Sequence, residues 1–287
     1  LITNRAKIEP KRIVFAEADH LDVLKAAQIA FEEGICHPIL LGSKEIILEL
    51  KEELGFYADL EIIDPKIKEE DARRNKFATI YWESRKRKGI SLYDAQKLMR
   101  ERNYFAAMMV NEGDADGLVT GHSRSYSSVV KPMLQLIDKA SGASIIATTN
   151  MMMTSRGSMF LSDTAINIDP SADDLAKIAI MTAKTARMFG VEPVIAMVSF
   201  SNFGSSTSPK ASKVREAVAY LHEYHPDIVI DGEIQADFAL NPEMLKEKFP
   251  FSKLAGKKVN TLIFPNLDSA NITYKLLKEL NKIDSIG

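Results

Sequence analysis

The segment Arg12-Ile-Val-Phe-Ala-Glu17 begins the pattern that decides the fold, because it is a short apolar run of the kind that forms a buried strand. A helical pattern follows from Asp22, a candidate helix cap, to Gly34, a residue type that commonly ends helices. The same alternation continues with a strand at 38–41, a helix at 44–54 and a strand at 60–63. Strands that alternate with helices predict crossover connections and a mainly parallel sheet.

The second half of the chain repeats this alternation. Ser171 is a predicted helix cap, and the helix that follows it ends at Gly190. A strand region is expected to start at Ile145-Ile-Ala147 and to pair with Met159-Phe-Leu161. Further elements are predicted as strands at 194–199, 227–230 and 261–264, and helices at 210–223 and 270–280. The pattern changes near Gly142, so we expect two α/β units, residues 1–143 and 144–287.

The composition of the chain limits the kinds of molecule that it is expected to bind. The chain has 37 Lys and Arg against 39 Asp and Glu, a formal charge of −2, so it has no bulk attraction to nucleic acid or an anionic membrane. Its apolar runs are strand-sized and too short to span a bilayer. One cysteine, Cys36, excludes an intramolecular disulfide, and we expect a cytoplasmic location.

Three junctions between a predicted strand and the next helix are rich in small and polar residues. They are Val119–Ser128, Ser199–Ser208 and Phe264–Asn271. In parallel sheets such junctions lie at the carboxyl edge, where hydroxyls, amides and helix N-termini bind phosphate groups. The same residue types also serve as ordinary turns and caps, but three loops at one edge favour a binding site.

The common nucleotide signatures are missing from the sequence. Neither GxxxxGK[ST] nor GxGxxG after a strand occurs, so ATP hydrolysis and ordinary dinucleotide binding lose support. We recognise no metal-ligand cluster. His222 and His225 are expected to be solvated near a helix end, while His20 and His122 follow strands and either face the site or do not.

Charged segments leave further alternatives open. Arg85-Lys-Arg-Lys88 is a solvated helix end or contributes one arginine to a phosphate. Asp231, Glu233 and Asp237 are expected to follow a strand, as bases, ligands or caps of the next element. Asp163 has the same alternatives.

Several segments form a recognisable set: Phe105–Val110, Gly113–Gly121, Ala196–Ser201 with Gly204-Ser205, Asp231–Gln235, and Phe264–Asp268 with Asn271–Lys275. Taken in order over nearly the whole chain, they resemble the phosphate acetyl/butyryltransferase family. The resemblance implies two three-layer α/β/α subdomains with mainly parallel sheets and a cleft between them, as in phosphate acetyltransferase and isocitrate dehydrogenase folds. It also implies that a coenzyme A thioester and phosphate bind in the cleft, and that subunits pair as homodimers or larger homo-oligomers.

Within that family, Ser201-Asn-Phe-Gly-Ser-Ser206 is most similar to the phosphotransacetylase-like domain at the C-terminus of large NADP-dependent malic enzymes. The chain lacks an initiator Met and stops soon after a helix, so we interpret it as part of a longer protein. In this interpretation an N-terminal malic enzyme part would hold NADP and a divalent metal. The present domain would bind acetyl-CoA as an allosteric effector.

Two departures from the active transferases support that interpretation. Phe203 stands where those enzymes carry lysine, and Lys131 stands before Pro132 where they carry arginine, which loses a bidentate fork. Arg85 matches a family arginine that contacts the ligand. The family's catalytic Ser, Arg and Asp lie in a later segment that also completes the first subdomain, so the resemblance assigns no catalytic residue and no metal ligand to this chain.

The leading hypothesis is therefore a regulatory acetyl-CoA-binding domain without transferase activity of its own. The alternative is an active phosphate acetyltransferase, which converts acetyl-CoA and phosphate to acetyl phosphate and CoA, and a third possibility is a purely structural dimerisation module. The residues expected to contact the thioester or phosphate are Arg85, Thr120, Gly121, His122, Ser123, Ser125, Lys131, Ser199, Ser201, Asn202, Phe203, Gly204, Ser205, Asp231, Glu233, Asn266 and Asn271.

Overall fold

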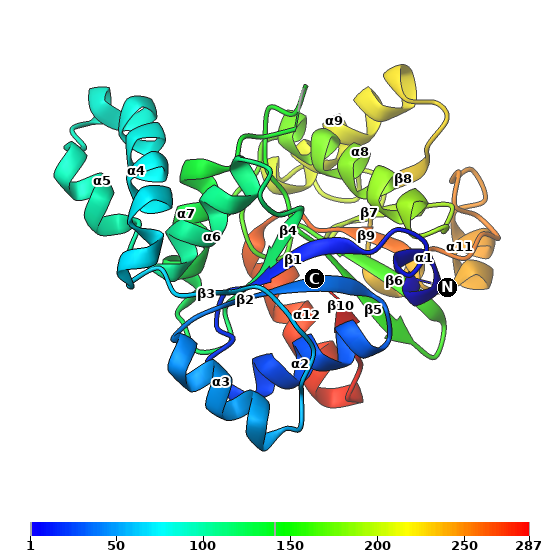
Figure 1. The fold of residues 1–287 in the computed structure, drawn as a ribbon. Coiled ribbons are helices and arrows are strands. Elements are labelled where there is room, and N and C mark those ends of the chain that lie inside the picture. The colour runs from blue at the N-terminus through cyan, green and yellow to red at the C-terminus, as the bar shows by residue number, and fades with distance from the viewer. Residues whose placement is uncertain (1, 141, 287) are drawn as a thin grey trace. The chain divides into compact units, whose positions relative to one another are not determined.

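A computed structural model describes residues 2–140 and 142–286 of the chain (Figure 1). The chain forms two compact units, Leu1–Asp138 and Lys139–Gly287, which we call the first and second units. Both are α/β units in which parallel strands predominate. The sequence placed the change between the units near residue 143.

The first unit contains a four-stranded sheet in which every pair of neighbouring strands is parallel. The strand order is β3-β2-β1-β4, so the chain adds strands on one side of β1 before β4 pairs with its other side. Of the strand predicted at 60–63, only the last two residues pair with β2. The strands are β1 (Lys11–Phe15), β2 (Cys36–Leu41), β3 (Ile62–Ile63) and β4 (Gly117–Val119).

Helices cover both faces of this sheet (Figure 1). Because successive strand residues point to opposite faces, Val14 packs with the cluster that includes α4–α7, whereas Phe15 packs with α2 and α3. Asp22 lies in the first turn of α2, and His20 is the cap residue, so the predicted cap at Asp22 was wrong. The helices are α1 (Ile2–Ala6), α2 (Leu21–Glu32), α3 (Lys44–Glu53), α4 (Asp71–Arg85), α5 (Leu92–Leu98), α6 (Arg102–Asn111) and α7 (Tyr126–Leu136), with 3₁₀ turns at Lys68–Glu70 and Lys86–Lys88.

The second unit contains a six-stranded sheet of order β10-β5-β6-β9-β7-β8. Strands β6, β9, β7 and β8 are parallel, and the β5–β6 hairpin and β10 form its antiparallel edge. The predicted strand start at 145–147 was wrong, because Ile145 and Ala147 pack against the helices and pairing begins at Thr149. The strands are β5 (Thr149–Thr154), β6 (Gly157–Ser162), β7 (Val194–Val198), β8 (Val229–Ile234), β9 (Thr261–Ile263) and β10 (Ser285–Ile286).

The two faces of the second sheet again carry alternate residues of each strand. Ile195 and Met197 pack against α8 and α9, whereas Ala196 and Val198 face the cluster that includes α10–α12. Ser171 caps α8 in a reciprocal capping box with Asp174, as the sequence predicted. The helices are α8 (Ala172–Met188), α9 (Pro209–Tyr224), α10 (Ala236–Ala239), α11 (Pro242–Lys248) and α12 (Leu267–Asn281).

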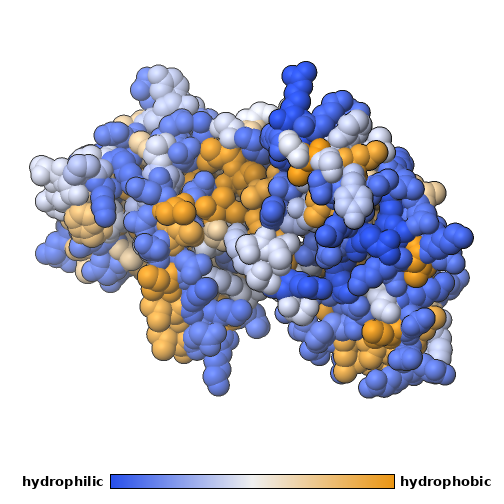
Figure 2. Space-filling model, turned by 90° about the vertical axis from the view of Figure 1, so that its left-hand side faces the viewer, coloured by the Kyte–Doolittle hydropathy of each residue, from blue (hydrophilic) through white to orange (hydrophobic). Residues whose placement is uncertain are grey.

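Apolar side chains interrupt a largely hydrophilic surface (Figure 2). On α12, Ile272, Leu276 and Leu280 are exposed at spacings of four residues, which places them on one side of the helix. None of the helices in the described part of the chain has the length and apolar character needed to cross a membrane.

Candidate functional site

Buried Glu17 organises the first predicted loop. Its carboxylate follows β1 and accepts hydrogen bonds from the backbone N–H groups of Gly121 (2.7 Å), His122 (3.0 Å) and Ser123 (2.9 Å). The hydroxyl groups of Ser123 and Thr120 also donate to it. The three amides expected to face a phosphate therefore face a carboxylate of the protein, and ligand contacts in this part of the loop fall to side chains.

The same contacts fix the charge of Glu17. Burial alone would raise the pKa of its carboxyl group, but the hydrogen bonds from Ser123, Gly121 and His122 outweigh burial and lower the pKa to about 2. Glu17 is consequently ionised at neutral pH. It is a structural anion that holds the β4–α7 loop against the end of β1.

A pocket of about 520 Å³ lies beside this loop, within the first unit. Arg124, Ser127, Ser128 and Lys131 contribute to its wall from the loop and from the first turns of α7. Positive side chains and hydroxyl groups near a helix N-terminus suit an anionic group such as phosphate. The volume is in the range of pockets that hold small molecules.

Arg102, another residue of the pocket wall, is held by an acidic partner. Its guanidinium donates to both oxygens of Asp19, at 2.6 and 2.9 Å, and Asp19 also accepts from the Ser43 backbone N–H. Burial alone would raise the pKa of Asp19, but the hydrogen bonds from Arg102 and Ser43 and the charge of Arg102 together outweigh burial, so the pKa is lowered. Because Arg102 is neutralised in this pair, Arg124 and Lys131 supply the available positive charge, and Glu101 is the acidic residue of the same wall.

Arg85 takes part in a contact between helices. It ends α4, and its guanidinium donates to the backbone carbonyl of Gln135 in α7 at 2.6 Å. The Gln135 side chain accepts from the hydroxyl groups of Tyr81 (3.0 Å) and Tyr104 (2.8 Å). Burial, with a contribution from Tyr81, raises the pKa of Tyr104 to about 12. Tyr104 lines the pocket, whereas Arg85 is half-buried and contacts α7, so the solvated helix-end alternative does not describe Arg85 and its expected contact with a phosphate stays a prediction.

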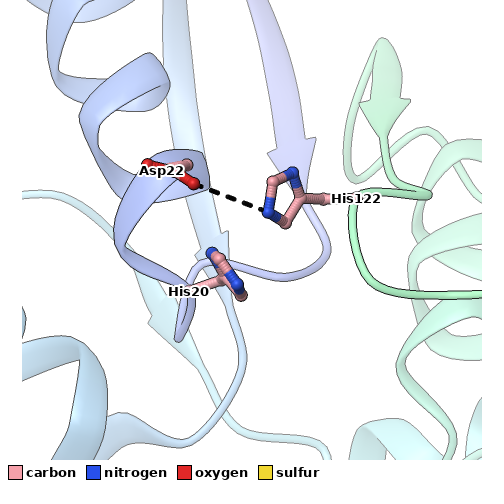
Figure 3. A group of neighbouring side chains, drawn as sticks. All are labelled: His20, Asp22 and His122. Carbon is pink, nitrogen blue, oxygen red and sulfur yellow. Dashed lines mark ion pairs between the residues drawn. The ribbon is translucent and has the colours of Figure 1, made fainter.

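The structure brings together one cluster that the sequence analysis missed. His20, Asp22 and His122 lie close to one another at the ends of β1 and β4 (Figure 3). About a hundred positions separate His122 from the other two residues, so no local spacing signals the cluster. His20 and His122 lie next to each other, with ring centroids 4.1 Å apart, and whether they face the predicted binding site stays a prediction.

Buried Glu233 organises the second predicted loop. Its Oε1 atom accepts from the Ser201 hydroxyl (2.9 Å), the Gly204 backbone N–H (2.8 Å) and the Arg215 guanidinium (3.2 Å). Its Oε2 atom is buried and has no hydrogen-bond partner among the described residues. The Ser201 hydroxyl also contacts the Ser205 hydroxyl at 3.0 Å. The Glu233 carboxylate therefore holds residues 201 and 204 of this loop together.

The rest of this loop is held by its own contacts. Ser199 follows β7 and donates its backbone N–H to Ile234. Asn202 exchanges two hydrogen bonds with Gln235, at 2.6 and 2.7 Å. Phe203 has a left-handed φ of 44°, and its ring packs against Phe249 and Phe251 with centroid distances of 5.0 and 5.1 Å. Phe203 is thus an aromatic anchor of this loop.

The carboxylates predicted to follow a strand lie inside β8. Asp231 and Glu233 are both strand residues, so their placement after a strand ending at 230 was wrong. Asp231 accepts from the Ser252 hydroxyl and the Lys253 backbone N–H, both at 2.8 Å, and so holds a different segment from Glu233. Between them, a side chain at Gly232 would meet the Met197 carbonyl at 2.5 Å, so only glycine fits. Asp237 lies in α10.

The third predicted loop is mostly helix. Asn266 caps α12 by accepting from the Ser269 backbone N–H at 2.9 Å, and Asn271 donates to the Thr164 carbonyl at 3.0 Å. Asp163 accepts several hydrogen bonds from residues 148 and 165–167, which lower its pKa although burial alone would raise it. Of the alternatives for these residues, the structure supports capping and loop bracing.

Two other sequence interpretations concern single residues. His222 is half-buried and its Nε2 atom lies 2.8 Å from the Ile230 carbonyl, so it is not simply solvated. Cys36 is buried and burial raises the pKa of its thiol, which agrees with a packing role.

Comparison with known proteins shows the family of this chain. The sequence model of the family Phosphate acetyl/butaryl transferase matches residues 1–287, and this chain belongs to that family. It is 40% identical to a phosphate acetyltransferase of Thermoanaerobacterium thermosaccharolyticum, covering 100% of this chain and 88% of that protein. It is also similar to the crystal structure of a phosphotransacetylase from Streptococcus pyogenes, with 38% identity, a TM-score of 0.87, and coverage of 100% of this chain and 86% of that one.

Similarity to malic enzymes is real but partial. The chain is 36% identical to an NADP-dependent malic enzyme of Salmonella typhimurium, covering 96% of this chain and 37% of that protein. The chain is thus a phosphotransacetylase-like domain, and its likeness to malic enzymes is confined to the corresponding part of those proteins.

Proposed function

We propose that this chain is a phosphate acetyltransferase, which exchanges an acetyl group between coenzyme A and inorganic phosphate. The observation that carries the proposal is the pocket of the first unit, where Arg124 and Lys131 supply positive charge beside the hydroxyl groups of Ser127 and Ser128. The relatives named phosphate acetyltransferase support the choice of acyl group, because they match over nearly the full length of both chains.

The reaction needs an anion site and a reactive carbonyl. In the direction of thioester formation, the thiolate of coenzyme A attacks the carbonyl carbon of acetyl phosphate and a C–S bond forms. The C–O bond to phosphate then breaks, and phosphate leaves with the bonding electrons. Positive charge held near the phosphate stabilises the leaving group, and hydroxyl donors orient its oxygens.

The pocket offers groups for this role. Lys131 and Arg124 would neutralise the phosphate, and the Ser127 hydroxyl would orient it from the first turn of α7, where the helix dipole also favours negative charge. Tyr104 and Pro132 add apolar surface to the same wall, suited to the acyl chain of the thioester. His122, Ser123 and the loop Ser199–Ser205 remain candidate contacts for other parts of the coenzyme, and pairing of two subunits is part of the same proposal.

The regulatory domain of an NADP-dependent malic enzyme is the second candidate. Its support is the 36% identity to the corresponding part of the Salmonella typhimurium enzyme and the aromatic anchor at Phe203. Two phosphate acetyltransferases are 40% and 37% identical to this chain, which spans 88% and 86% of their length, and this favours the transferase over the leading sequence-based hypothesis. NADP and a divalent metal would belong only to the preceding part of such a malic enzyme.

The test follows thioester formation from acetyl phosphate and coenzyme A. We expect steady turnover by the full-length protein that carries this chain, and Lys131→Ala should lower its kcat/KM by about 10- to 100-fold, the loss of one charge-assisted hydrogen bond. Lys131→Arg should retain activity, because the fork of arginine also binds phosphate. Lys25→Ala, which removes an exposed lysine on α2, is the matched control and should change nothing.

Absence of turnover together with saturable acetyl-CoA binding would favour the regulatory domain. Equal activity of Lys131→Ala and the parent would contradict the assignment of the pocket.

A further inference from the structure

His20, Asp22 and His122 form a compact group of metal-ligating side chains outside the pocket. One ligand atom from each residue can be chosen such that all three lie within 4.8 Å of one another. The His122 Nε2 and Asp22 Oδ2 atoms are 3.7 Å apart, and the two imidazole centroids are 4.1 Å apart (Figure 3). Two imidazoles and one carboxylate therefore face a common point.

The backbone beneath this group is held in place by one residue. Glu17 accepts from the His20 backbone N–H through its carbonyl at 2.9 Å and from the His122 backbone N–H through its Oε1 atom at 3.0 Å. Asp22 stands in the first turn of α2, two positions after His20. The two histidines come from segments far apart in the sequence, yet a single buried residue contacts both of their backbones, His20 through its carbonyl and His122 through its carboxylate.

We propose that these three side chains bind a divalent transition-metal ion of the zinc class. One ring nitrogen of each histidine and one oxygen of Asp22 would be the protein ligands, and water would complete the coordination. Imidazole nitrogen is a preferred donor for zinc, nickel and copper, and two histidines with one carboxylate is a recurrent set for sites that keep an open position.

The geometry requires only small side-chain movements. Metal–ligand distances of about 2.0–2.1 Å place neighbouring ligand atoms of a tetrahedral ion about 3.3 Å apart. The side chains of His122 and Asp22 are 41% and 67% exposed, so their rotamers are free to close on an ion. An ordinary ion pair between Asp22 and His122 would leave His20 without a role, whereas a metal uses all three residues.

A bound ion would join two segments of the first unit. Its ligands come from the β1–α2 turn and from the β4–α7 loop, which Glu17 already holds together from below. Arg124 lies two positions after His122 and lines the pocket, so a metal would also restrain the approach to that pocket. The metal proposal does not depend on the transferase proposal, since its test measures metal binding and not turnover, and only His122 of the three ligands is also a candidate contact for the coenzyme.

The experiment is a titration of the untagged protein with Co²⁺, followed by its visible d–d absorption, and then displacement of Co²⁺ by Zn²⁺. We expect saturation at one ion per chain. His20→Ala and Asp22→Asn should each weaken Co²⁺ binding by at least about tenfold. Mutating a residue that only hydrogen-bonds to a metal ligand already lowers the affinity by about that factor. His37→Ala removes another exposed histidine of the same unit and should leave the titration unchanged.

Thermal unfolding in the presence of Zn²⁺ gives a second readout. The midpoint should rise with Zn²⁺ concentration for the parent and for His37→Ala, and much less for His20→Ala and Asp22→Asn. The proposal is overturned if no saturable binding occurs, or if His20→Ala and Asp22→Asn bind Co²⁺ as tightly as the parent does.

Discussion

Glu17 in the first unit and Glu233 in the second each hold a loop through hydrogen bonds to a buried carboxylate, but Glu17 makes more of these bonds than Glu233 does. Each is a buried carboxylate at the sheet that accepts hydrogen bonds from a loop rich in glycine and serine. Glu17 uses both oxygens and takes three backbone N–H groups. Glu233 uses only Oε1, takes one backbone N–H from that loop, and completes the set with the 39% exposed Arg215.

The difference shows what such loops are built for. A glycine- and serine-rich loop after a strand looks like a phosphate cradle, but in both units an internal carboxylate takes a large part of its donors. The cavity of the first unit lies farther along, at the start of α7. The β4–α7 loop thus supports the neighbouring pocket, and its backbone N–H groups at residues 121–123 already donate to Glu17.

The largest effect is expected from Glu17→Gln. The amide would place N–H donors against backbone N–H donors and would leave buried groups unsatisfied, so the free energy of unfolding should fall by about 3 kcal/mol or more. Chemical denaturation measures the change, with Glu53→Gln, an exposed glutamate at the end of α3, as the control. If Glu17→Gln lowers the free energy of unfolding no more than Glu53→Gln does, Glu17 does not hold the loop.

The pH dependence of stability should carry the same signature. The pKa of Glu17 is lowered in the folded protein from 4.5 to about 2, so its contribution is present above pH 4.5 and is lost as the pH falls towards 2. The parent protein should therefore lose stability faster than Glu17→Gln across that interval. Parallel acid profiles of the two proteins would contradict the lowered pKa.

Phe203→Lys should have an intermediate effect. The ring packs on Phe249 and Phe251, and replacing it with a charged chain should cost about 1–2 kcal/mol of folding free energy. Phe203→Leu retains apolar contact and should cost less. If thermal unfolding shows Phe203→Lys to be as stable as the parent, the aromatic cluster does not anchor the loop.

The smallest effect is expected from Glu233→Gln. The three contacts of Oε1 survive in the amide, the nitrogen takes the place of the unpartnered Oε2, and the charge lost from the pair with half-exposed Arg215 is screened by solvent. The unfolding free energy should change by less than about 1 kcal/mol. A loss as large as that of Glu17→Gln would remove the contrast between the two loops.

Local patterns predicted most of the fold. The capping box at Ser171 and the alternation of strands with helices depend on neighbouring residues, so they are readable in the sequence. The errors came where distant contacts decide. Asp231 and Glu233 look like loop residues, yet they lie inside a strand, where Ser252 and Ser201 donate hydrogen bonds to them.

The site shows the same division. The serine-rich segment before α7 was recognisable, and Arg124 lay in that segment but was passed over. Glu17 and Arg102 were missed as well, because their roles depend on partners about a hundred positions away and 83 positions away. His20 and Asp22 meet His122 for the same reason, through pairing of β1 with β4.

Calorimetric titration of acetyl-CoA into the protein in phosphate buffer tests the central claim most directly. A phosphate acetyltransferase should give heat that persists after each injection and increases with protein concentration, because acetyl transfer to phosphate continues. A saturable isotherm that returns to the baseline would contradict the transferase and indicate binding without turnover.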